Sequence, residues 1–87
     1  MGKYKLRFKK SVAKDLRMIP NLDVSRILKK IKKLTKDPRP TGCSKLTGLE
    51  KYRIRQGRYR IIYEIREAVL VINVVKIAHR SNVYKSI

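Results

Sequence analysis

The chain has 87 residues with 43% apolar side chains, which is enough for one compact domain over residues 1–87 and too little for a second core. Its 24 lysines and arginines against six carboxylates give a net charge of +18, far above the ~2–8 that keeps a small domain soluble. Such self-repulsion predicts a polyanionic partner, which can be nucleic acid, a ribosome surface, an anionic membrane or an acidic protein.

The first half of the chain predicts one strand followed by two helices. Residues 4–8 alternate between apolar and basic side chains, which is the period of a half-buried strand. Ser11 can cap a short helix that Pro20 ends. Residues 23–36 repeat apolar side chains with the helical period and carry lysines on the other side, including Lys30 and Lys33. Those lysines either follow a phosphate backbone or form an ordinary solvated face.

The second half of the chain predicts a sheet. Residues 37–42 contain two prolines and a glycine, so we expect a turn-rich connector there. Residues 52–55, 59–63 and 69–77 then have the composition of strands. The last of these is almost wholly apolar, as in a strand covered on both faces, so we expect it inside the sheet.

Residues 51–63 predict a tight hairpin that is rich in arginine. If the central glutamine and glycine form a two-residue loop, Arg55 faces Arg58 and Arg53 faces Arg60, and four arginines share one face. Like charges directly across a strand pair are destabilising, so this pattern indicates a multiply charged anion such as phosphate, which guanidinium groups bind well. An ordinary half-exposed hairpin is the alternative. A bulged three-residue loop would also separate the arginines.

The segment after the long apolar strand has the second candidate cluster. His79 is the only histidine, and its near-neutral pKa suits proton exchange in RNA cleavage, while Arg80 and Tyr84 can bind or protonate phosphate oxygens. His79 can equally be structural. A two-residue loop after the preceding strand would direct it to the arginine face, and a three-residue loop would direct Ala78 there.

Other kinds of site are not expected from this sequence. One histidine, one cysteine and six scattered carboxylates cannot supply a plausible metal site, and the glycines match no nucleotide-binding motif. No apolar stretch is long enough to span a bilayer, and residues 1–10 lack the apolar core of a secretory signal. Cys43 has no second cysteine with which to form a disulfide, which agrees with a reducing compartment, so we expect a cytoplasmic protein. From the preceding observations we also expect no membrane attachment, metal or other cofactor.

The order and spacing of several segments resemble the RelE/ParE superfamily of toxins over essentially the whole chain. The segments are the strand and helix hairpin at the start, then KLTGL (45–49), YRIR (52–55), GRYRIIY (57–63) and HRSNVY (79–84). The resemblance implies an α+β fold, in which an N-terminal strand and a two-helix hairpin pack on a mostly antiparallel sheet of about four strands, followed by a short polar tail.

The resemblance also implies a function in a type II toxin–antitoxin system, with an acidic, RelB-like antitoxin that blocks the toxin's site. For the RelE branch it implies cleavage of messenger RNA in the A site of the 70S ribosome, where a 2′-hydroxyl attacks the adjacent phosphate. A ParE-like toxin that inhibits DNA gyrase and cleaves no RNA is the alternative. A plain RNA-binding module is a third reading, although aromatic residues for stacking are sparse.

By position, the family's site residues match Arg53, Arg55, Arg60 and Tyr84. Two positions depart from the pattern, because Ala78 and Thr47 stand where well-studied RelE members have arginines. We expect Arg60 and Arg80 to bind the scissile phosphate, with His79 or Tyr84 serving the leaving oxygen and the remaining two arginines supplying the field. The residues expected to bind RNA around this site are Lys30, Lys33, Lys45, Lys51, Arg58 and Lys85.

Overall fold

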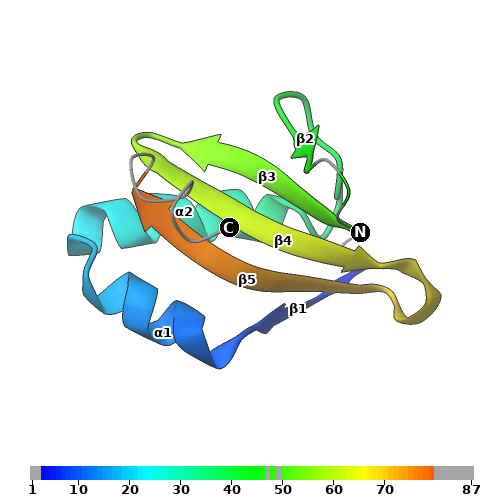
Figure 1. Ribbon diagram of the computed structural model, residues 1–87, viewed down its shortest axis with the longest axis horizontal. Coiled ribbons are helices and arrows are strands. Elements are labelled where there is room, and N and C mark those ends of the chain that lie inside the picture. The colour runs from blue at the N-terminus through cyan, green and yellow to red at the C-terminus, as the bar shows by residue number, and fades with distance from the viewer. Residues whose placement is uncertain (1–2, 47, 49, 80–87) are drawn as a thin grey trace.

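The fold comes from a computed structural model that describes residues 3–46, 48 and 50–79. Its elements, in chain order, are β1 (Lys5–Phe8), α1 (Lys10–Arg17), α2 (Asn21–Lys33), β2 (Ser44–Lys45), β3 (Lys51–Gln56), β4 (Tyr59–Arg66), the 3-10 turn η1 (Glu67–Val69) and β5 (Val71–His79) (Figure 1). The strands form one sheet in the order β1-β5-β4-β3-β2, in which β1 and β5 are parallel and the other neighbours are antiparallel. The predicted α+β class is confirmed, with five strands where about four were expected.

The additional strand is β2, at the edge of the sheet. Its residues Ser44 and Lys45 pair with Arg53 and Tyr52 of β3, and both are exposed. Two residues are too few to show the alternation by which a strand is recognised in a sequence. The difference therefore concerns an edge and leaves the class of the fold unchanged.

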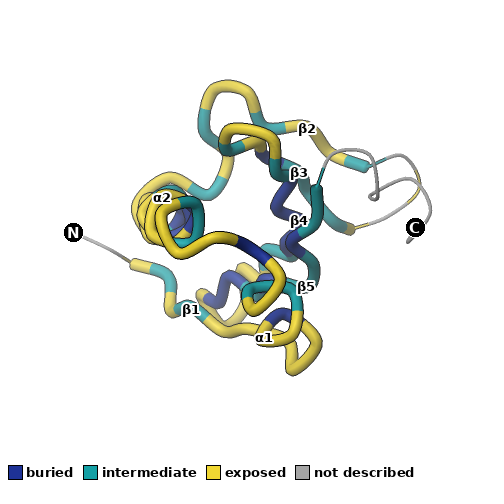
Figure 2. The backbone as a smooth tube through the Cα atoms, turned by 90° about the vertical axis from the view of Figure 1, so that its left-hand side faces the viewer, coloured by how far each residue is buried: buried dark blue, intermediate teal, exposed yellow. Residues whose placement is uncertain are grey.

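Both helices lie on the same side of the sheet, and the hydrophobic core fills the space between (Figure 2). The helical side of the core includes Val12, Ile27 and Ile31, and the sheet contributes the strand side chains that point toward the helices. These core residues, each no more than 2% exposed, are Val12, Ile27, Ile31, Leu34, Ile54, Ile61, Tyr63, Ile72, Val74 and Ile77. Burial of each aliphatic side chain contributes about 1.5–3 kcal/mol. We call the sheet face that neither helix covers the open face.

The ends of the helices differ from the predicted ends by a few residues. α1 begins one residue before Ser11, which therefore lies inside the helix and does not cap it. α2 begins directly after Pro20 instead of at Asp23, because a proline has no N–H that needs a partner and its φ suits the start of a helix. It ends at Lys33, three residues before the predicted end. Within the described residues, no helix is long and apolar enough to cross a membrane.

Helix α1 covers the free edge of β5. β1 pairs with β5 only as far as Val74, and beyond that point the Asp15 carboxylate accepts a hydrogen bond from the Ile77 backbone N–H at 3.1 Å. The same carboxylate lies 3.3 Å from the Lys76 ammonium group. An edge strand with unpaired backbone groups can recruit another chain, so Asp15 protects this edge.

The register of the β3–β4 hairpin differs from the predicted one. Its two loop residues are Gly57 and Arg58, because Gln56 pairs with Tyr59. Gly57 has a φ of +60° whereas Arg58 stays outside the left-handed region, which is the pattern of a type II′ turn. As a result Arg55 pairs with Arg60 and Arg53 pairs with Ile62, so the predicted pairings of Arg55 with Arg58 and of Arg53 with Arg60 are both wrong.

The β4–β5 connection decides which residue at the end of β5 faces the arginines. Arg66 pairs with Val71 across a four-residue loop, and a bulge between Ile62 and Tyr63 then shifts the register by one residue. Ala78 therefore pairs with Arg60. The loop has four residues, so neither loop length considered from the sequence is correct. The bulge, of which the sequence gives no sign, is what puts Ala78 on the face of Arg60.

Candidate nucleic-acid interface

The open face of the sheet is strongly basic. Side chains at directly paired positions of neighbouring strands point to the same side, so the ladder registers define the members of this face. Its cations are Lys5, Arg7, Lys51, Arg53, Arg55, Arg60, Arg66 and Lys76, and Glu64 is the one carboxylate that the described strands add to it. This concentration of positive charge makes the open face the candidate surface for a polyanion.

Arg53, Arg55 and Arg60 form the centre of this surface, and we call them the arginine trio. Arg55 and Arg60 are directly opposed on β3 and β4, and Arg53 lies two residues from Arg55 on the same strand. Directly opposed side chains have Cβ atoms about 4.5–5.5 Å apart. The sequence hypothesis expected four arginines on one side of the sheet. The registers put these three there, whereas Arg58 lies in the hairpin turn.

The members of the trio differ in exposure. Arg60 is only 5% exposed, whereas Arg53 is half-buried and Arg55 is exposed. A buried guanidinium group acts in a lower effective dielectric than a solvated one, so its attraction for a phosphate is less screened. The ion pairs formed among residues 3–46, 48 and 50–79 are Arg39–Glu67, Lys45–Glu50, Arg66–Glu64 and Lys76–Asp15, and none involves Arg53 or Arg55.

His79 lies on the other side of the sheet from the trio. It pairs with Tyr59 across the β4–β5 ladder, and the two rings meet edge to face with their centroids 5.7 Å apart. His79 lines a hollow of about 320 Å³ on the helix side of the sheet, together with Asp23, Gly57 and Arg58. The structure therefore puts His79 and Arg60 on opposite sides of the sheet, which argues against the predicted role of His79 at the scissile phosphate.

The predicted RNA-binding residues divide among several surfaces. Lys51 lies on the open face, opposite Glu64, and Arg58 lies in the hairpin turn. Lys45 pairs with Tyr52, so it lies on the helix side of the sheet, 3.8 Å from the Glu50 carboxylate. Lys30 and Lys33 belong to α2, the layer behind the sheet. The remaining predicted residues, Arg80, Tyr84 and Lys85, fall outside the described residues, as does Thr47.

A second group of residues, which the sequence did not single out, fixes the end of β3 and β4. The hydroxyl of Tyr63 donates a hydrogen bond to the Pro38 carbonyl at 2.6 Å and lies 3.3 Å from Cys43 Sγ. Burial raises the pKa of Tyr63 above its ordinary value. The Tyr63 ring stacks on that of Tyr52 at 5.9 Å. The connector is thereby packed against the helix side of the sheet.

Arg39 completes this group. It donates through Nε to the Tyr52 hydroxyl at 3.3 Å and through Nη2 to the Glu67 carboxylate at 2.5 Å. Its guanidinium carbon lies 5.2 Å from the centre of the Tyr52 ring. The hydrogen bonds to Tyr52 and Glu67 raise the pKa of Arg39. This arginine therefore has a structural role, and a lone arginine between two prolines gives no sign of it in the sequence.

Comparison with known proteins identifies the family. A family model described as the ParE toxin of type II toxin–antitoxin systems, parDE, matches residues 6–84. No curated protein matches the chain significantly. Among solved structures, a chain of the archaeal RelE–RelB complex from Pyrococcus horikoshii OT3 is 31% identical, with a TM-score of 0.80 over 90% of this chain and 96% of that one.

Two other structures give the same result. A chain of the RelB–RelE complex from Methanococcus jannaschii is 27% identical, with a TM-score of 0.74 over 93% of this chain and 98% of that one. The isolated E. coli RelE toxin is 26% identical, with a TM-score of 0.77 over 95% of this chain and 93% of that one. The chain belongs to the RelE/ParE superfamily and is a RelE-like toxin of the type II toxin–antitoxin class.

Proposed function

We propose that this toxin is a ribosome-dependent endoribonuclease that cleaves messenger RNA in the ribosomal A site. The observation that carries the proposal is the arginine trio, in which a buried Arg60 and an exposed Arg55 are directly opposed on the open face. Like charges at opposed positions are destabilising, and a phosphodiester between them converts this repulsion into attraction.

The proposed reaction is attack of a ribose 2′-hydroxyl on the adjacent phosphorus. The 2′-hydroxyl loses its proton to water as the 2′-oxygen–phosphorus bond forms. The phosphorus–5′-oxygen bond breaks and the 5′-oxygen takes up a proton, which leaves a cyclic phosphate and a 5′-hydroxyl. Negative charge develops on the phosphate oxygens, so fixed guanidinium donors stabilise the transition state more than the ground state. In this proposal Arg60 and Arg80 bind the phosphate, and Tyr84 donates a proton to the leaving 5′-oxygen. Arg53 and Arg55 supply a positive electrostatic potential around the phosphate.

The proposed reaction uses no metal ion, because the positive charge at the phosphate comes from guanidinium groups that stay protonated at any working pH. Cleavage should therefore persist when a chelator removes transition metals, provided that enough magnesium is present to keep the ribosomes intact.

Cleavage is tested by adding the purified toxin to ribosomes that translate a defined message and mapping the 5′ ends of the fragments. The wild-type protein should cut in the A site, and both Arg60→Ala and Arg55→Ala should reduce the rate by at least about tenfold, because each removes a charge-assisted contact. Arg55 is exposed, so that variant separates loss of contact from loss of fold. Lys14→Ala, an exposed change on α1, is the control and should cut at the wild-type rate. Intact message with the folded wild-type protein would overturn the proposal.

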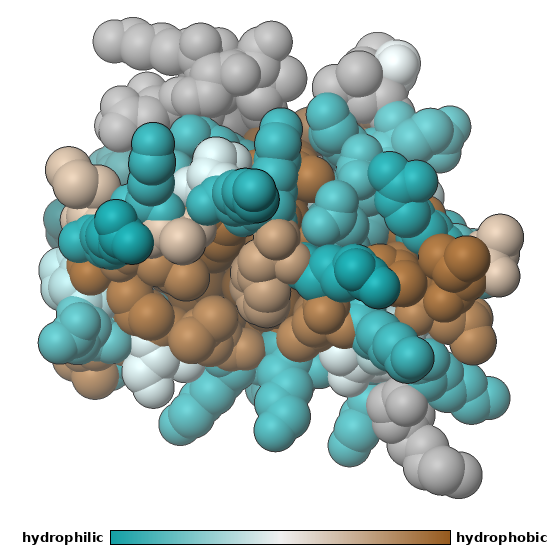
Figure 3. Space-filling view, turned by 90° about the horizontal axis from the view of Figure 1, so that it is seen from below, coloured by the Kyte–Doolittle hydropathy of each residue, from teal (hydrophilic) through white to brown (hydrophobic). Residues whose placement is uncertain are grey.

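The proposed regulator is an acidic, RelB-like antitoxin. The net charge of +18 favours an acidic partner, and exposed apolar side chains such as Phe8, Met18 and Leu22 offer contact area. Seen from below, apolar side chains form a band framed by hydrophilic ones (Figure 3). An acidic protein encoded beside this toxin should bind it and stop cleavage at one-to-one or similar stoichiometry, whereas unaffected cleavage would contradict this part of the proposal.

A second candidate function is inhibition of DNA gyrase without cleavage of RNA. Two observations favour it: the matching family model is that of the ParE toxin, and Ala78 is the residue opposite Arg60. A supercoiling assay separates the candidates. Inhibited gyrase together with undisturbed translation selects this second function, and active gyrase together with A-site cuts selects the first.

A further inference from the structure

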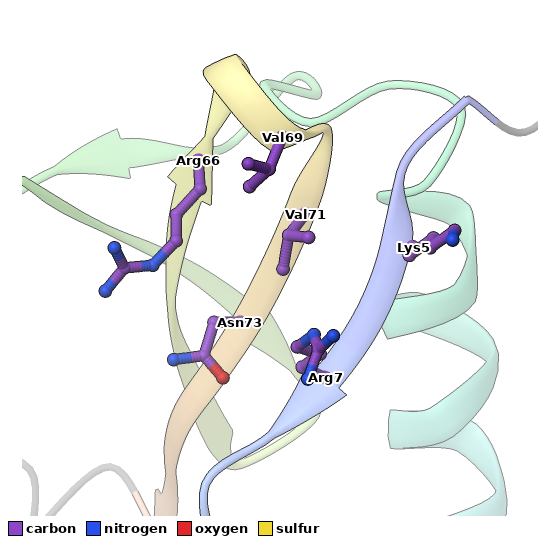
Figure 4. A pocket seen from close by; sticks show the side chains of 6 residues that line it. All are labelled: Lys5, Arg7, Arg66, Val69, Val71 and Asn73. Carbon is purple, nitrogen blue, oxygen red and sulfur yellow. The ribbon is translucent and has the colours of Figure 1, made fainter.

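The open face has a second basic region, at the end far from the β3–β4 turn. It surrounds a hollow of about 390 Å³, lined by Lys5, Arg7, Arg66, Val69, Val71 and Asn73 (Figure 4). Arg7 pairs with Asn73, and both Lys5 and Arg66 pair with Val71, so these strand residues all belong to the open face. None of them has a part in the cleavage site proposed above.

The hollow has an excess of positive charge. Three of its six lining residues are cations and none is a carboxylate. The Oε1 atom of Glu64 accepts a hydrogen bond from the lining residue Asn73 at 3.1 Å and lies 3.4 Å from Arg66. Neither Lys5 nor Arg7 takes part in an ion pair within the described portion of the chain. Glu64 therefore holds Asn73 and Arg66 in position and leaves most of the charge available to a ligand.

The two arginines lie on opposite sides of the hollow. They come from β1 and β4, the strands on either side of β5, whose axes are separated by about 10 Å. In Figure 4 Arg7 and Arg66 stand on opposite sides of Val71 and Asn73. Arginine side chains are long and end in a planar group with several donors, so both Arg7 and Arg66 can reach a phosphate above β5.

The rest of the hollow is apolar. Val71 is 7% exposed and Val69 beside it is 63% exposed. Val69 precedes Leu70, whose φ of +53° is the one left-handed conformation of a non-glycine residue among those described. Such a conformation costs on the order of 1 kcal/mol and is often kept where a loop has a function. An apolar wall beside a phosphate site suits a nucleobase or ribose attached to that phosphate, because a bare inorganic anion would gain nothing from it.

The position of the hollow limits what can occupy it. Arg66 and Arg60 lie on the same strand, on the same face and six residues apart, which is roughly 20 Å. One nucleotide cannot reach from the trio to the hollow, whereas an extended strand of several nucleotides can. RNA held at the trio would thus present a more distant nucleotide to the hollow.

We infer that this hollow is a second RNA subsite, which binds one phosphate between Arg7 and Arg66 and the attached nucleoside against Val69 and Val71. The inference rests on the proposed function in that the ligand is RNA. The nucleotide belongs either to the message, several residues from the cut, or to ribosomal RNA, since the same chemistry recognises both.

The experiment compares the double variant Arg7→Ala/Arg66→Ala with the control Arg17→Ala/Arg26→Ala, whose arginines are exposed on the helices. Each protein is titrated with a 2′-O-methyl oligonucleotide too short to reach beyond the trio, with a longer one, and with vacant ribosomes. The 2′-O-methyl groups prevent cleavage. If the message occupies the hollow, the test variant should bind the longer oligonucleotide about tenfold more weakly than the wild type does, and with a smaller salt dependence. Its affinity for the short oligonucleotide should equal that of the wild type.

The outcomes distinguish the two RNA sources and the two proposals. Weaker binding to ribosomes, with unchanged binding to both oligonucleotides, assigns the nucleotide to ribosomal RNA and supports the subsite. Wild-type affinity of the test variant for all three ligands overturns it. Failure of the wild-type protein to cut message would remove the proposed nuclease function, yet the contrast between short and long oligonucleotides would still test the hollow.

Discussion

Replacing Arg55 with glutamine is expected to make the folded toxin more stable and its binding to RNA weaker. Arg55 and Arg60 are directly opposed on β3 and β4, and like charges in that position cost about 0.2–1 kcal/mol. Arg55 is exposed, so its replacement with glutamine removes few packing contacts. For a domain of this size 1 kcal/mol corresponds to roughly 4–8 °C, so the Tm should rise by about 1–8 °C.

The assay is thermal unfolding by circular dichroism at low ionic strength, with RNA binding measured on the same samples. The gain in Tm should shrink as salt is added, because the Debye length falls to about 8 Å at physiological ionic strength. The control Lys29→Gln changes an exposed lysine on α2 and should leave both Tm and RNA binding near the wild-type values. An Arg55→Gln variant that is less stable and binds RNA as tightly as the wild type would refute the reasoning.

Three further predictions concern the scaffold and are measured by urea unfolding. Tyr63→Phe should lower the free energy of unfolding by about 1–2 kcal/mol, because the Pro38 carbonyl loses its donor. Burial raises the pKa of Tyr63 above 10.0, so this tyrosine stabilises the fold fully below pH 10 and progressively less above it, and the alkaline decline should be shallower in Tyr63→Phe. Asp15→Ala should cost about 1–3 kcal/mol, since the Ile77 N–H and the Lys76 ammonium lose the carboxylate that they contact. Gly57→Ala should lower the free energy of unfolding by about 1 kcal/mol, because alanine disfavours the φ of +60° at this position. No steric clash adds to this cost, since an added Cβ meets open space. Wild-type stability in Tyr63→Phe or Asp15→Ala would contradict the corresponding contact, and in Gly57→Ala it would contradict the left-handed conformation of that residue.

The sequence predicts the parts of the fold that depend on long periodic patterns. The apolar residues of α2 and the nearly continuous apolar run of β5 are strong signals, and both elements occur within two or three residues of their predicted bounds. The arginine trio also survives the error in the hairpin loop. Moving the loop from Gln56-Gly57 to Gly57-Arg58 changes every partner by two positions, which preserves the face on which Arg53 and Arg60 lie.

The remaining features depend on single residues whose effect is not local. One bulge beside Tyr63 decides that Ala78, and not His79, faces Arg60, because a shift by one residue exchanges the two faces of a strand. The hollow at Arg7 and Arg66 joins strands from opposite ends of the chain, so no local pattern could reveal it. The Tyr63 hydrogen bond to Pro38 depends in the same way on how the connector packs.

The claim that the arginine trio binds a phosphodiester is tested most directly by NMR of the arginine Nε–Hε groups. The protein is titrated with a short 2′-O-methyl RNA, which can bind without being cut. The Nε–Hε signals of Arg53, Arg55 and Arg60 should shift and saturate together, while those of Arg17 and Arg26 on the helices stay in place. Saturating RNA that shifts the helix arginines and leaves the trio unchanged would contradict the account.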